Sequence, residues 1–376
     1  MEVTMRDLIV FGEDFGGLPS STQHLVRHLA LRHKVLWVNS IGLRQPKLSA
    51  KDATRAFNKL FGKTKAVTQN MLDSEGHDNI TVVNLKTIPA PDSAISRKLA
   101  KFMMLHQLKP IIAELKLEAP ILWTSLPTAV DLCGHLGESS VVYYCGDDFS
   151  ALAGVDHDTV AKHESELIEK ADLIFAASDK LMTKFPEDKT QLLPHGVDVS
   201  LFSTPAPRAT DLPSSHRPVA GFYGSLSKWL DYDMIERVAS AAPEWDFVFI
   251  GPNELDTLML PKLSNVHYLG PRPHHTLPSY SQHWDVSLLP FVDNEQIRAC
   301  SPLKLMEYLA AGTPIIATPF PALLPYQEHV TTVGSANQMI WALDHARQLS
   351  NSPISVVEQD SWQNRGNFVH WMLELL

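Results

Sequence analysis

The sequence is poor in cysteine and has no excess of basic residues. Its three cysteines, Cys133, Cys145 and Cys300, are scattered without the paired spacing of a metal site or a redox motif. An odd and sparse set of this kind is typical of a reducing cytosol and predicts no disulfide framework. The formal net charge is −10, which argues against general nucleic-acid binding because that needs a basic surface.

Long apolar runs are also missing. No uninterrupted run reaches the length that a bilayer-spanning helix needs. The N-terminal segment MEVTMRDLIVFG flanks a short apolar run with acidic residues and lacks the pattern of a signal peptide. We therefore expect a cytoplasmic protein that is either soluble or bound peripherally to the inner face of a membrane.

What the sequence does contain is a repeated alternation of short β-branched runs and helical stretches. This alternation is typical of α/β proteins with parallel sheets. A length of 376 residues exceeds that of one ordinary core and predicts two domains. In the first half we expect strands at 7–12, 33–40, 79–85, 120–125, 141–145 and 172–178. In the second half we expect strands at 219–225, 246–252, 265–270, 285–291 and 313–318.

The alternation breaks at residues 191–218, a proline- and serine-rich stretch that we interpret as a linker. The sequence therefore predicts two Rossmann-like domains, one over 1–200 and one over 201–355. Such sheets bind ligands beyond the carboxyl ends of their strands, so the chemistry is expected in the loops there. The closing segment, 356–376, is expected to form an amphipathic helix.

One helix start in the second half carries an unusual charge. Within SPLKLMEYLAAGTPIIATP, Ser301 is the expected N-cap, Pro302 the first helical residue and Gly312 the left-handed end. Lys304 in the first turn opposes the helix dipole, at a cost of about 0.3–1 kcal/mol, and it precedes Glu307 in the weaker order for an ion pair. An anion bound by the first-turn amides and by Lys304 would remove the conflict. The alternative is a lysine that extends into solvent.

The loop after the first expected strand, GEDFGGLPSS, is glycine-rich but has neither the GxGxxG nor the Walker A spacing. This argues against a nicotinamide dehydrogenase. Gly16 and Gly17 would let the backbone approach a phosphate; the alternative is that they only permit a tight turn. A helix is expected to follow from Ser20, with a capping box between Ser20 and Gln23.

Several stretches of the second half resemble the C-terminal domain of glycosyltransferase family 4, whose members have the GT-B fold. They are PHGVD (194–198), GFYGSLSKW (221–229), and the runs 265–291 and 301–319. The resemblance extends more loosely over the rest of the chain. It implies two Rossmann-like domains that face each other across a cleft, with the nucleotide-sugar donor mainly on the C-terminal domain. It also implies that the last helix packs back on the N-terminal domain.

The family's E-x7-E motif falls on Ala299 to Glu307. The resemblance implies that Glu307 accepts the ribose hydroxyls of the nucleotide. The first glutamate, which contacts the transferred sugar in the family, is replaced by Ala299, and Glu295 or Asn294 are candidates to supply that contact.

The resemblance also implies further contacts to the donor. Amides of Leu303 and Lys304 would hold the diphosphate, with the lysine ammonium neutralising it. Ser225 takes the place of a family arginine, and Lys228 lies one place short of a family lysine, with an ordinary surface lysine as the alternative. Arg272 lies where the base-binding loop runs and is expected to stack on the base or bond it. The expected donor-binding residues are Gly16, Gly17, Ser225, Lys228, Arg272, Asn294, Ser301, Pro302, Leu303, Lys304 and Glu307.

Transfer needs a stabilised leaving group and a deprotonated acceptor. Lys304, Lys228 and helix amides would stabilise the departing diphosphate. The candidates for a general base are Asp147 and Asp148, directly after the expected strand 141–145, because adjacent carboxylates can hold one raised pKa. The alternative is that Asp148 caps a turn and that both are solvated. Retaining members of the family need no base, and the stereochemistry stays open.

A second carboxylate pair, Glu13 and Asp14, is expected to face the same cleft. No metal or other cofactor is expected: His24 and His28 lie four residues apart but lack the glutamate of a zinc-protease motif.

A basic stripe recurs at every fourth residue from Lys47 to Lys63, with Lys51, Arg55 and Lys59 between them. On a helix this spacing, beside an apolar face, suggests contact with anionic lipid headgroups. The alternative is a solvated helix face.

Together these features predict a glycosyltransferase, of the hexosyltransferase type, that uses a UDP- or GDP-linked sugar as its donor. The acceptor is expected to be a saccharide or a lipid-linked molecule, as in the synthesis of cell-surface polysaccharide or glycolipid. Two rivals stay open: a nucleotide-sugar epimerase of the same fold, and a non-catalytic nucleotide-sugar binding protein.

Overall fold

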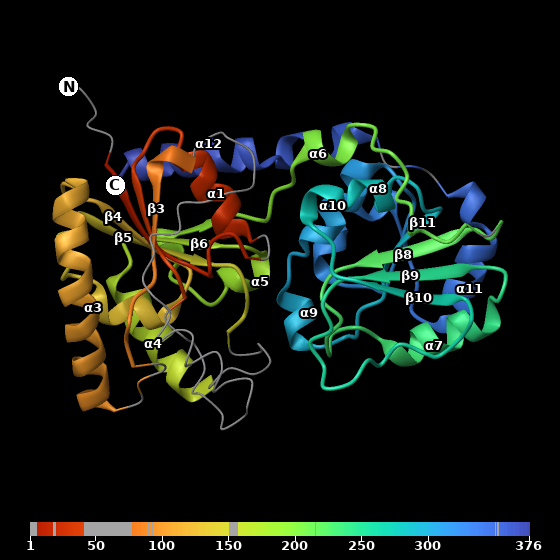
Figure 1. Ribbon diagram of the computed structural model, residues 1–376, viewed down its shortest axis with the longest axis horizontal. Coiled ribbons are helices and arrows are strands. Elements are labelled where there is room, and N and C mark those ends of the chain that lie inside the picture. Colours follow the sequence, from red (N-terminus) through yellow and green to blue (C-terminus); the bar gives the residue numbers. More distant parts are fainter. Residues whose placement is uncertain are drawn as a thin grey trace. The chain divides into compact units, whose positions relative to one another are not determined.

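A computed structural model describes residues 6–17, 20–40, 77–88, 91, 93–149, 157–214, 216–349, 351 and 353–376. The chain divides into two compact units (Figure 1). The first contains Met1–Pro194 and Arg365–Leu376, and the second contains His195–Asn364. The division falls inside the expected linker, a few residues before the boundary at 200 that we set from the sequence. Each unit is described by itself below.

The first unit is built on a parallel sheet whose described strands have the order β3-β2-β1-β4-β5-β6-β7. These strands are β1 (Leu8–Phe11), β2 (Val35–Val38), β3 (Ile80–Val83), β4 (Ile121–Thr124), β5 (Ser140–Cys145), β6 (Leu173–Ala176) and β7 (Thr190–Leu192). The central strands are buried along their whole length because helices cover both faces of the sheet, as parallel sheets require. The strand order reverses between β1 and β4, where ligands bind in sheets of this kind.

The described helices of this unit lie on both faces of its sheet. They are α1 (Ser21–Leu29), α3 (Ala94–Leu115), α4 (His157–Lys170), α5 (Asp179–Met182) and α12 (Trp362–Glu374), with short 3-10 helices η1 (His77–Asn79), η2 (Pro127–Leu132) and η3 (Glu187–Lys189). Figure 1 shows α1 and α12 on one face and α3 and α4 on the other. None of the helices among the described residues is both long and apolar enough to cross a membrane.

The last helix packs against the first unit although it is the most distant element in sequence. His28 Nε2 lies 3.1 Å from Asn367 Oδ1, and His33 Nε2 lies 3.1 Å from His370 Nδ1. A Cβ at Gly366 would lie 2.2 Å from the ring of His28, so glycine is needed for this close approach. The expected helix over 356–376 begins only at Trp362, and these contacts are of the kind that the family resemblance implies.

The second unit is also built on a parallel sheet, whose described strands have the order β10-β9-β8-β11-β12-β13. They are β8 (Val219–Tyr223), β9 (Asp246–Ile250), β10 (Val266–Gly270), β11 (Val286–Leu289), β12 (Ile315–Ala317) and β13 (Val330–Thr332). The order again reverses in the middle, here between β8 and β11, as in a Rossmann sheet.

The described helices of the second unit complete its two outer layers. They are α6 (Val199–Ser203), α7 (Tyr232–Ala241), α8 (Pro278–Ser281), α9 (Glu295–Ala299), α10 (Leu303–Ala311) and α11 (Ala336–Asp344). Its 3-10 helices are η4 (His274–Thr276), η5 (Pro321–His329), η6 (Ala346–Gln348), η7 (Ile354–Val356) and η8 (Glu358–Asp360). Trp284 fills the space beside β8, where a Cβ at Gly221 would lie 1.8 Å from the indole ring.

Every strand that we expected from the sequence is present. The two that we missed, β7 and β13, have three residues each and lie at the edges of the two sheets. Runs of three residues are too short to show a hydrophobic pattern, and β7 overlaps the stretch that we assigned to the linker.

Candidate functional site

Three adjacent strands of the second unit end in glycines that bring the backbones close together. Gly224, Gly251 and Gly270 follow or end β8, β9 and β10, and their φ angles are 142°, 139° and 72°. The Gly224 amide donates to Ile250 O at 2.8 Å, and the Gly251 amide donates to Gly270 O at 3.0 Å. A Cβ at Gly251 would lie 2.0 Å from the Gly224 carbonyl oxygen. None of these three residues places a side chain at this carboxyl edge of the sheet, so a ligand can approach their backbone closely.

The side chain of Lys304 crosses this glycine edge. A Cβ at Gly224 would lie 1.9 Å from Lys304 Cε and 2.9 Å from its Nζ, so the lysine occupies the space that the glycine leaves. Lys304 is half-buried and belongs to the first turn of α10. Its ammonium and the positive end of the helix are thus placed at the end of β8. This combination favours the binding of an anion such as a diphosphate.

The helix start itself differs from our prediction. Ser301 is not the N-cap and Pro302 is not the first helical residue: Pro302 is the N-cap, with an extended ψ of 122°, and the helix begins at Leu303. Ser301 lies one residue too far from the first-turn amides to cap them, and proline has no side-chain acceptor, so no side chain among the described residues caps this helix. The expected left-handed end at Gly312 is confirmed, with a φ of 78°.

Glu307 lies one turn further along α10 and is held by a residue that we did not predict. His274 Nε2 lies 2.7 Å from Glu307 Oε1, and both side chains are largely buried. The His274 ring also packs edge-on against Phe202. Burial raises the pKa of Tyr223, and the neighbouring charge of Glu307 raises it further. No pattern in the sequence indicated His274, because its contact with Glu307 depends on how the loop after β10 returns to α10.

Arg272 follows β10 and is engaged by two side chains. Its Nη2 lies 2.6 Å from Asp211 Oδ2, and its Nε lies 3.1 Å from the Tyr280 hydroxyl. Burial raises the pKa of Asp211, but the hydrogen bonds from Arg272 and Tyr280 outweigh burial, and the pKa is lowered overall. Asp211 and Tyr280 thus hold the Arg272 guanidinium near the glycines that end the strands. The expected contact of Arg272 with the nucleotide base stays a prediction.

In the loop before α10, the side chains of Asn294 and Glu295 interact with residues of helix α9. Asn294 caps α9 by accepting from the Ile297 amide at 2.8 Å, and Glu295 forms an ion pair with Arg298 at 3.0 Å. Ala299 is only 1% exposed. The structure therefore assigns Asn294 a capping role, and a contact of Asn294 or Glu295 with the transferred sugar stays a prediction.

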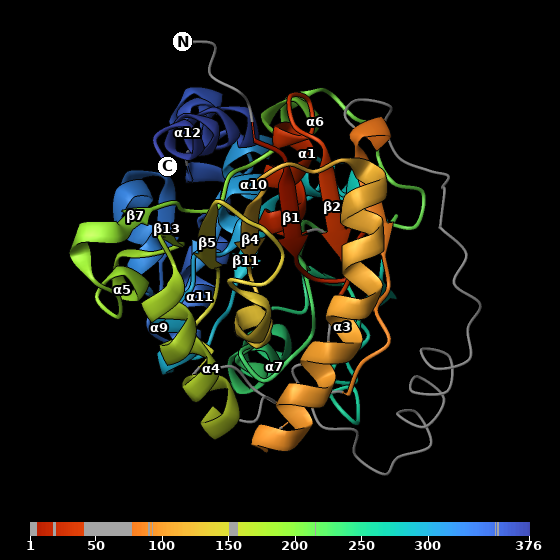
Figure 2. The same cartoon turned by 90° about the vertical axis from the view of Figure 1, so that its left-hand side faces the viewer.

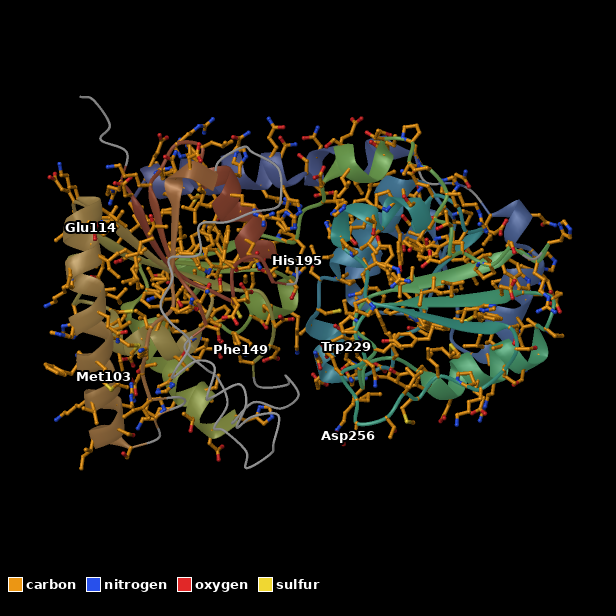
Figure 3. The ribbon with its side chains drawn as sticks, viewed as in Figure 1. Met103, Glu114, Phe149, His195, Trp229 and Asp256 are labelled. Carbon is orange, nitrogen blue, oxygen red and sulfur yellow. The ribbon has the colours of Figure 1, made fainter. Side chains whose placement is uncertain are left out.

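The remaining expected donor contacts lie in the loop after β8. Ser225 directly follows Gly224 and is half-buried, whereas Lys228 is exposed. Trp229, the next residue, is labelled in Figure 3 and closes this loop: its carbonyl accepts from the Val292 amide at 2.9 Å. The exposure of Lys228 is compatible with the surface-lysine alternative.

In the glycine loop of the first unit, the amides of Gly16 and Gly17 both donate hydrogen bonds within the protein. The Gly16 amide donates to Gln23 Oε1 at 3.0 Å, and the Gly17 amide donates to a carbonyl three residues earlier. Ser20 is the N-cap of α1, as expected, and accepts from the Gln23 amide, while the Gln23 side chain accepts from the Gly16 amide. Since the Gly16 amide donates to a side chain of α1 and the Gly17 amide to a carbonyl of the loop, the structure favours the tight-turn alternative for Gly16 and Gly17.

The carboxylates of the first unit are grouped differently from our expectation. Burial raises the pKa of Glu13, and the charges of Asp147 and Asp14 raise it further, although Ser20 donates a hydrogen bond to the carboxylate. Glu13 and Asp147 therefore interact across the carboxyl edge of the sheet, from the loops after β1 and β5. Asp148, in contrast, forms an ion pair with Lys184 Nζ at 2.7 Å. Glu13, coupled to Asp147, is thus a carboxyl group with a raised pKa at this edge of the sheet.

Two expectations concern features that the structure does not place or does not contain. Residues 47–63, the predicted basic stripe, lie outside the described residues. Across the described ranges, no group of three or more His, Cys, Asp or Glu side chains is arranged to hold a metal ion.

Comparison with known proteins identifies the second unit. Residues 217–347 match the family model described as Glycosyl transferases group 1. This segment is a group 1 glycosyltransferase domain. Gly224, Arg272, Lys304 and Glu307 all lie inside the group 1 domain, whereas Glu13 and Asp147 lie outside it. The finer assignment to glycosyltransferase family 4 stays a prediction.

A curated relative extends the likeness beyond the segment that the family model matches. TuaH of Bacillus subtilis (strain 168), whose name assigns it as a glycosyltransferase of teichuronic acid biosynthesis, is 29% identical over 248 residues. The match covers 59% of this chain and 62% of TuaH, so it spans less than two thirds of that relative.

Solved structures match over nearly the full length. Anabaena HepE, in complex with UDP and glucose, gives a TM-score of 0.68 at 12% identity, over 99% of this chain and 100% of HepE. Sucrose-phosphate synthase of Thermosynechococcus elongatus gives 0.64 at 14% identity, over 98% and 95%. At these identities the likeness concerns the fold, and it confirms the expected class of GT-B with two Rossmann-like domains.

Proposed function

We propose that this protein is a glycosyltransferase that moves a sugar from a UDP- or GDP-linked donor to a saccharide or lipid-linked acceptor. The observation that carries the proposal is the packing of Lys304 across Gly224 inside the group 1 domain. A strand edge formed by glycines, a helix start without a side-chain cap and the Lys304 ammonium meet there, and each favours a diphosphate.

The same arrangement suits the chemistry of the leaving group. When the sugar departs, negative charge develops on the terminal phosphate of the nucleoside diphosphate. The Lys304 ammonium and the amides of Leu303 and Lys304 are fixed before the reaction, so they would stabilise that charge without reorganising. Glu307, which contacts His274, would accept ribose hydroxyls from the same helix.

The general base belongs to the first unit in this proposal. Asp147 is the better candidate of the two adjacent aspartates, because Asp148 is held by Lys184. Coupling to Glu13 keeps one proton available to this pair at a higher pH than an isolated carboxyl group would, since the pKa of Glu13 is raised by burial and by Asp147. The base would be needed only for an inverting transfer.

We also propose that the donor is UDP-linked in the first instance and that the product enters a cell-surface polysaccharide. The complex of HepE with UDP and glucose and the name of TuaH support these choices. Further proposals are that transfer needs no metal, that it takes place on the cytoplasmic side of the membrane, and that residues 47–63 contact anionic lipid. Activity that survives in excess EDTA would support the first of these.

A donor-hydrolysis assay tests the proposed activity without knowledge of the acceptor. The full-length protein is incubated with a panel of UDP- and GDP-sugars, and the nucleoside diphosphate and the sugar are analysed separately. Slow release of UDP or GDP from one donor supports a transferase. A sugar of changed configuration, still linked to the nucleotide, would instead indicate an epimerase. Tight binding with no turnover of any donor would indicate a non-catalytic binder.

A further inference from the structure

The outer face of α3 exposes a row of large apolar side chains. The helix has 22 residues and runs along the first unit, as Figure 2 shows. Ala100, Met104 and Leu108 are its buried side chains. On the opposite side, Ile95 is 81% exposed, Leu99 51% and Phe102 68%. Their spacing of four and three residues places them on one face of the helix.

The same face is positively charged. Lys98 and Lys109 are exposed, and Lys101, half-buried between them, has its Nζ 2.6 Å from His135 Nε2. The acidic residue of α3 is Glu114, in its last turn near the end labelled in Figure 3. This is a local reversal of sign in a chain with a net charge of −10.

Two further observations describe the surroundings of this face. Burial lowers the pKa of His135, and the neighbouring charges of Lys101, Lys170 and Lys109 lower it further, as expected beside a positive surface. The inner side of the helix is held firmly: Arg97 forms ion pairs with Asp131 of η2 and Glu166 of α4. The exposed apolar row is therefore presented by a fixed helix and is not the result of a loose one.

The charge of the face decides which partner fits it. A second copy of this chain would bring the same lysines together, and like charges across an interface are unfavourable. Contiguous apolar groups rimmed by cations match a membrane surface instead, where the apolar side chains enter the boundary between headgroups and acyl chains and the lysines meet lipid phosphates.

We propose that the face formed by Ile95, Lys98, Leu99, Phe102 and Lys109, with Lys101 at its side, docks the first unit on a bilayer that contains anionic lipid. The helix lies in the plane of the interface and does not cross the membrane. The proposal uses a surface other than residues 47–63 and does not depend on glycosyl transfer. Together with the proposed activity, it would hold the first unit, which contains the candidate general base, where a lipid-linked acceptor is found.

Flotation with lipid vesicles tests the proposal on the full-length protein. Vesicles of phosphatidylcholine alone are compared with vesicles that also contain phosphatidylglycerol, and binding is expected to the second kind. Phe102→Glu should lower the partition coefficient by at least about tenfold, because a phenylalanine side chain is lost from the interface and a negative charge is added. The matched control is Leu324→Glu in the second unit, where the side chain is also 68% exposed, and no change is expected.

The charged half of the face has its own test. The double variant Lys98→Gln/Lys109→Gln should lower binding to phosphatidylglycerol vesicles by about 30-fold, and the dependence of binding on salt should weaken with it. Both variants change exposed side chains, so the thermal unfolding midpoint and the binding of UDP should stay as in the wild type. These two readouts separate a failure of the membrane proposal from a failure of the proposed activity.

Three outcomes would overturn the proposal. The first is a wild-type protein that does not float with anionic vesicles. The second is a Phe102→Glu variant that binds vesicles as well as the Leu324→Glu control does. The third is a dimer, seen by light scattering, that Phe102→Glu dissociates; that result would assign the face to self-association.

Discussion

Replacing Lys304 with methionine tests the phosphate site most directly. The lysine stem packs on Gly224, and methionine keeps much of that apolar stem while it removes the ammonium. A hydrogen bond that involves a charged group contributes about 1.5–3 kcal/mol, so Lys304→Met should weaken UDP binding by about 10- to 150-fold. Lys304 is half-buried, so water screens the lost charge only in part and an effect in this range is expected.

Isothermal titration calorimetry with UDP and GDP measures the effect. The matched control is Lys262→Met, which removes the same charge from an exposed position of the same unit and should change the affinity by less than about twofold. The thermal unfolding midpoint without nucleotide verifies that each variant folds. An unchanged affinity for UDP in a folded Lys304→Met variant would refute the assignment of the phosphate site.

A second variant separates the position of the ammonium from its charge. Gly224→Ala keeps Lys304, but the added Cβ would lie 1.9 Å from Lys304 Cε at a φ of 142°. The side chain must therefore move, and UDP affinity should fall although the charge remains. If only Lys304→Met weakened binding, the lysine would act as a general surface charge, and the close packing that we describe would have no part in it.

Three other predictions concern buried polar groups. The raised pKa of Glu13 means that the folded state binds this proton more tightly than the unfolded state does, so the stability that it contributes is present at acid pH and is lost as pH rises through the folded pKa. Glu13→Gln should therefore raise the free energy of unfolding at pH 7 and have little effect on it below pH 4. Urea titrations at the two pH values measure the difference. His274→Ala leaves Glu307 without its partner and should destabilise the protein by about 1–3 kcal/mol, with weaker UDP binding because the carboxylate is no longer oriented; if calorimetry finds equal UDP affinity, His274 has no positioning role. Lys184→Met removes the cation beside the buried Glu164 and should cost about 1–3 kcal/mol in chemical denaturation, whereas the same substitution at the exposed Lys180 should be nearly neutral.

The features that depend only on residues close together in the chain could be predicted from the sequence. Parallel strands buried on both faces appear as short apolar runs, so every expected strand was found, while β7 and β13 were missed because they have three residues each. The conflict between Lys304 and the helix dipole also lies within one turn of chain, and it indicated the place where the structure has an uncapped helix start. The cap itself was misplaced by one residue, because Pro302 takes an extended ψ and the helix begins after it.

Contacts between segments that are distant in the chain could not be predicted from the sequence. Glu307 and His274 are 33 residues apart and meet only because α10 and the loop after β10 share one edge of the sheet. The coupling of Glu13 to Asp147 has the same origin, since it joins the ends of β1 and β5. Adjacency in sequence also did not indicate the ion pair of Asp148 with Lys184, which depends on the position of the residues after α5.

The membership of residues 365–376 in the first unit has a consequence for biosynthesis. A ribosome completes 1–194 long before it reaches the segment that supplies Phe368 and His370, so the surfaces around Phe175 and His33 stay uncovered while the whole group 1 domain is being made. The second unit can therefore complete its hydrophobic core before the first unit does, although the first unit is synthesised earlier. Truncation at residue 364 should for this reason damage the half of the protein that lies furthest from the cut in sequence.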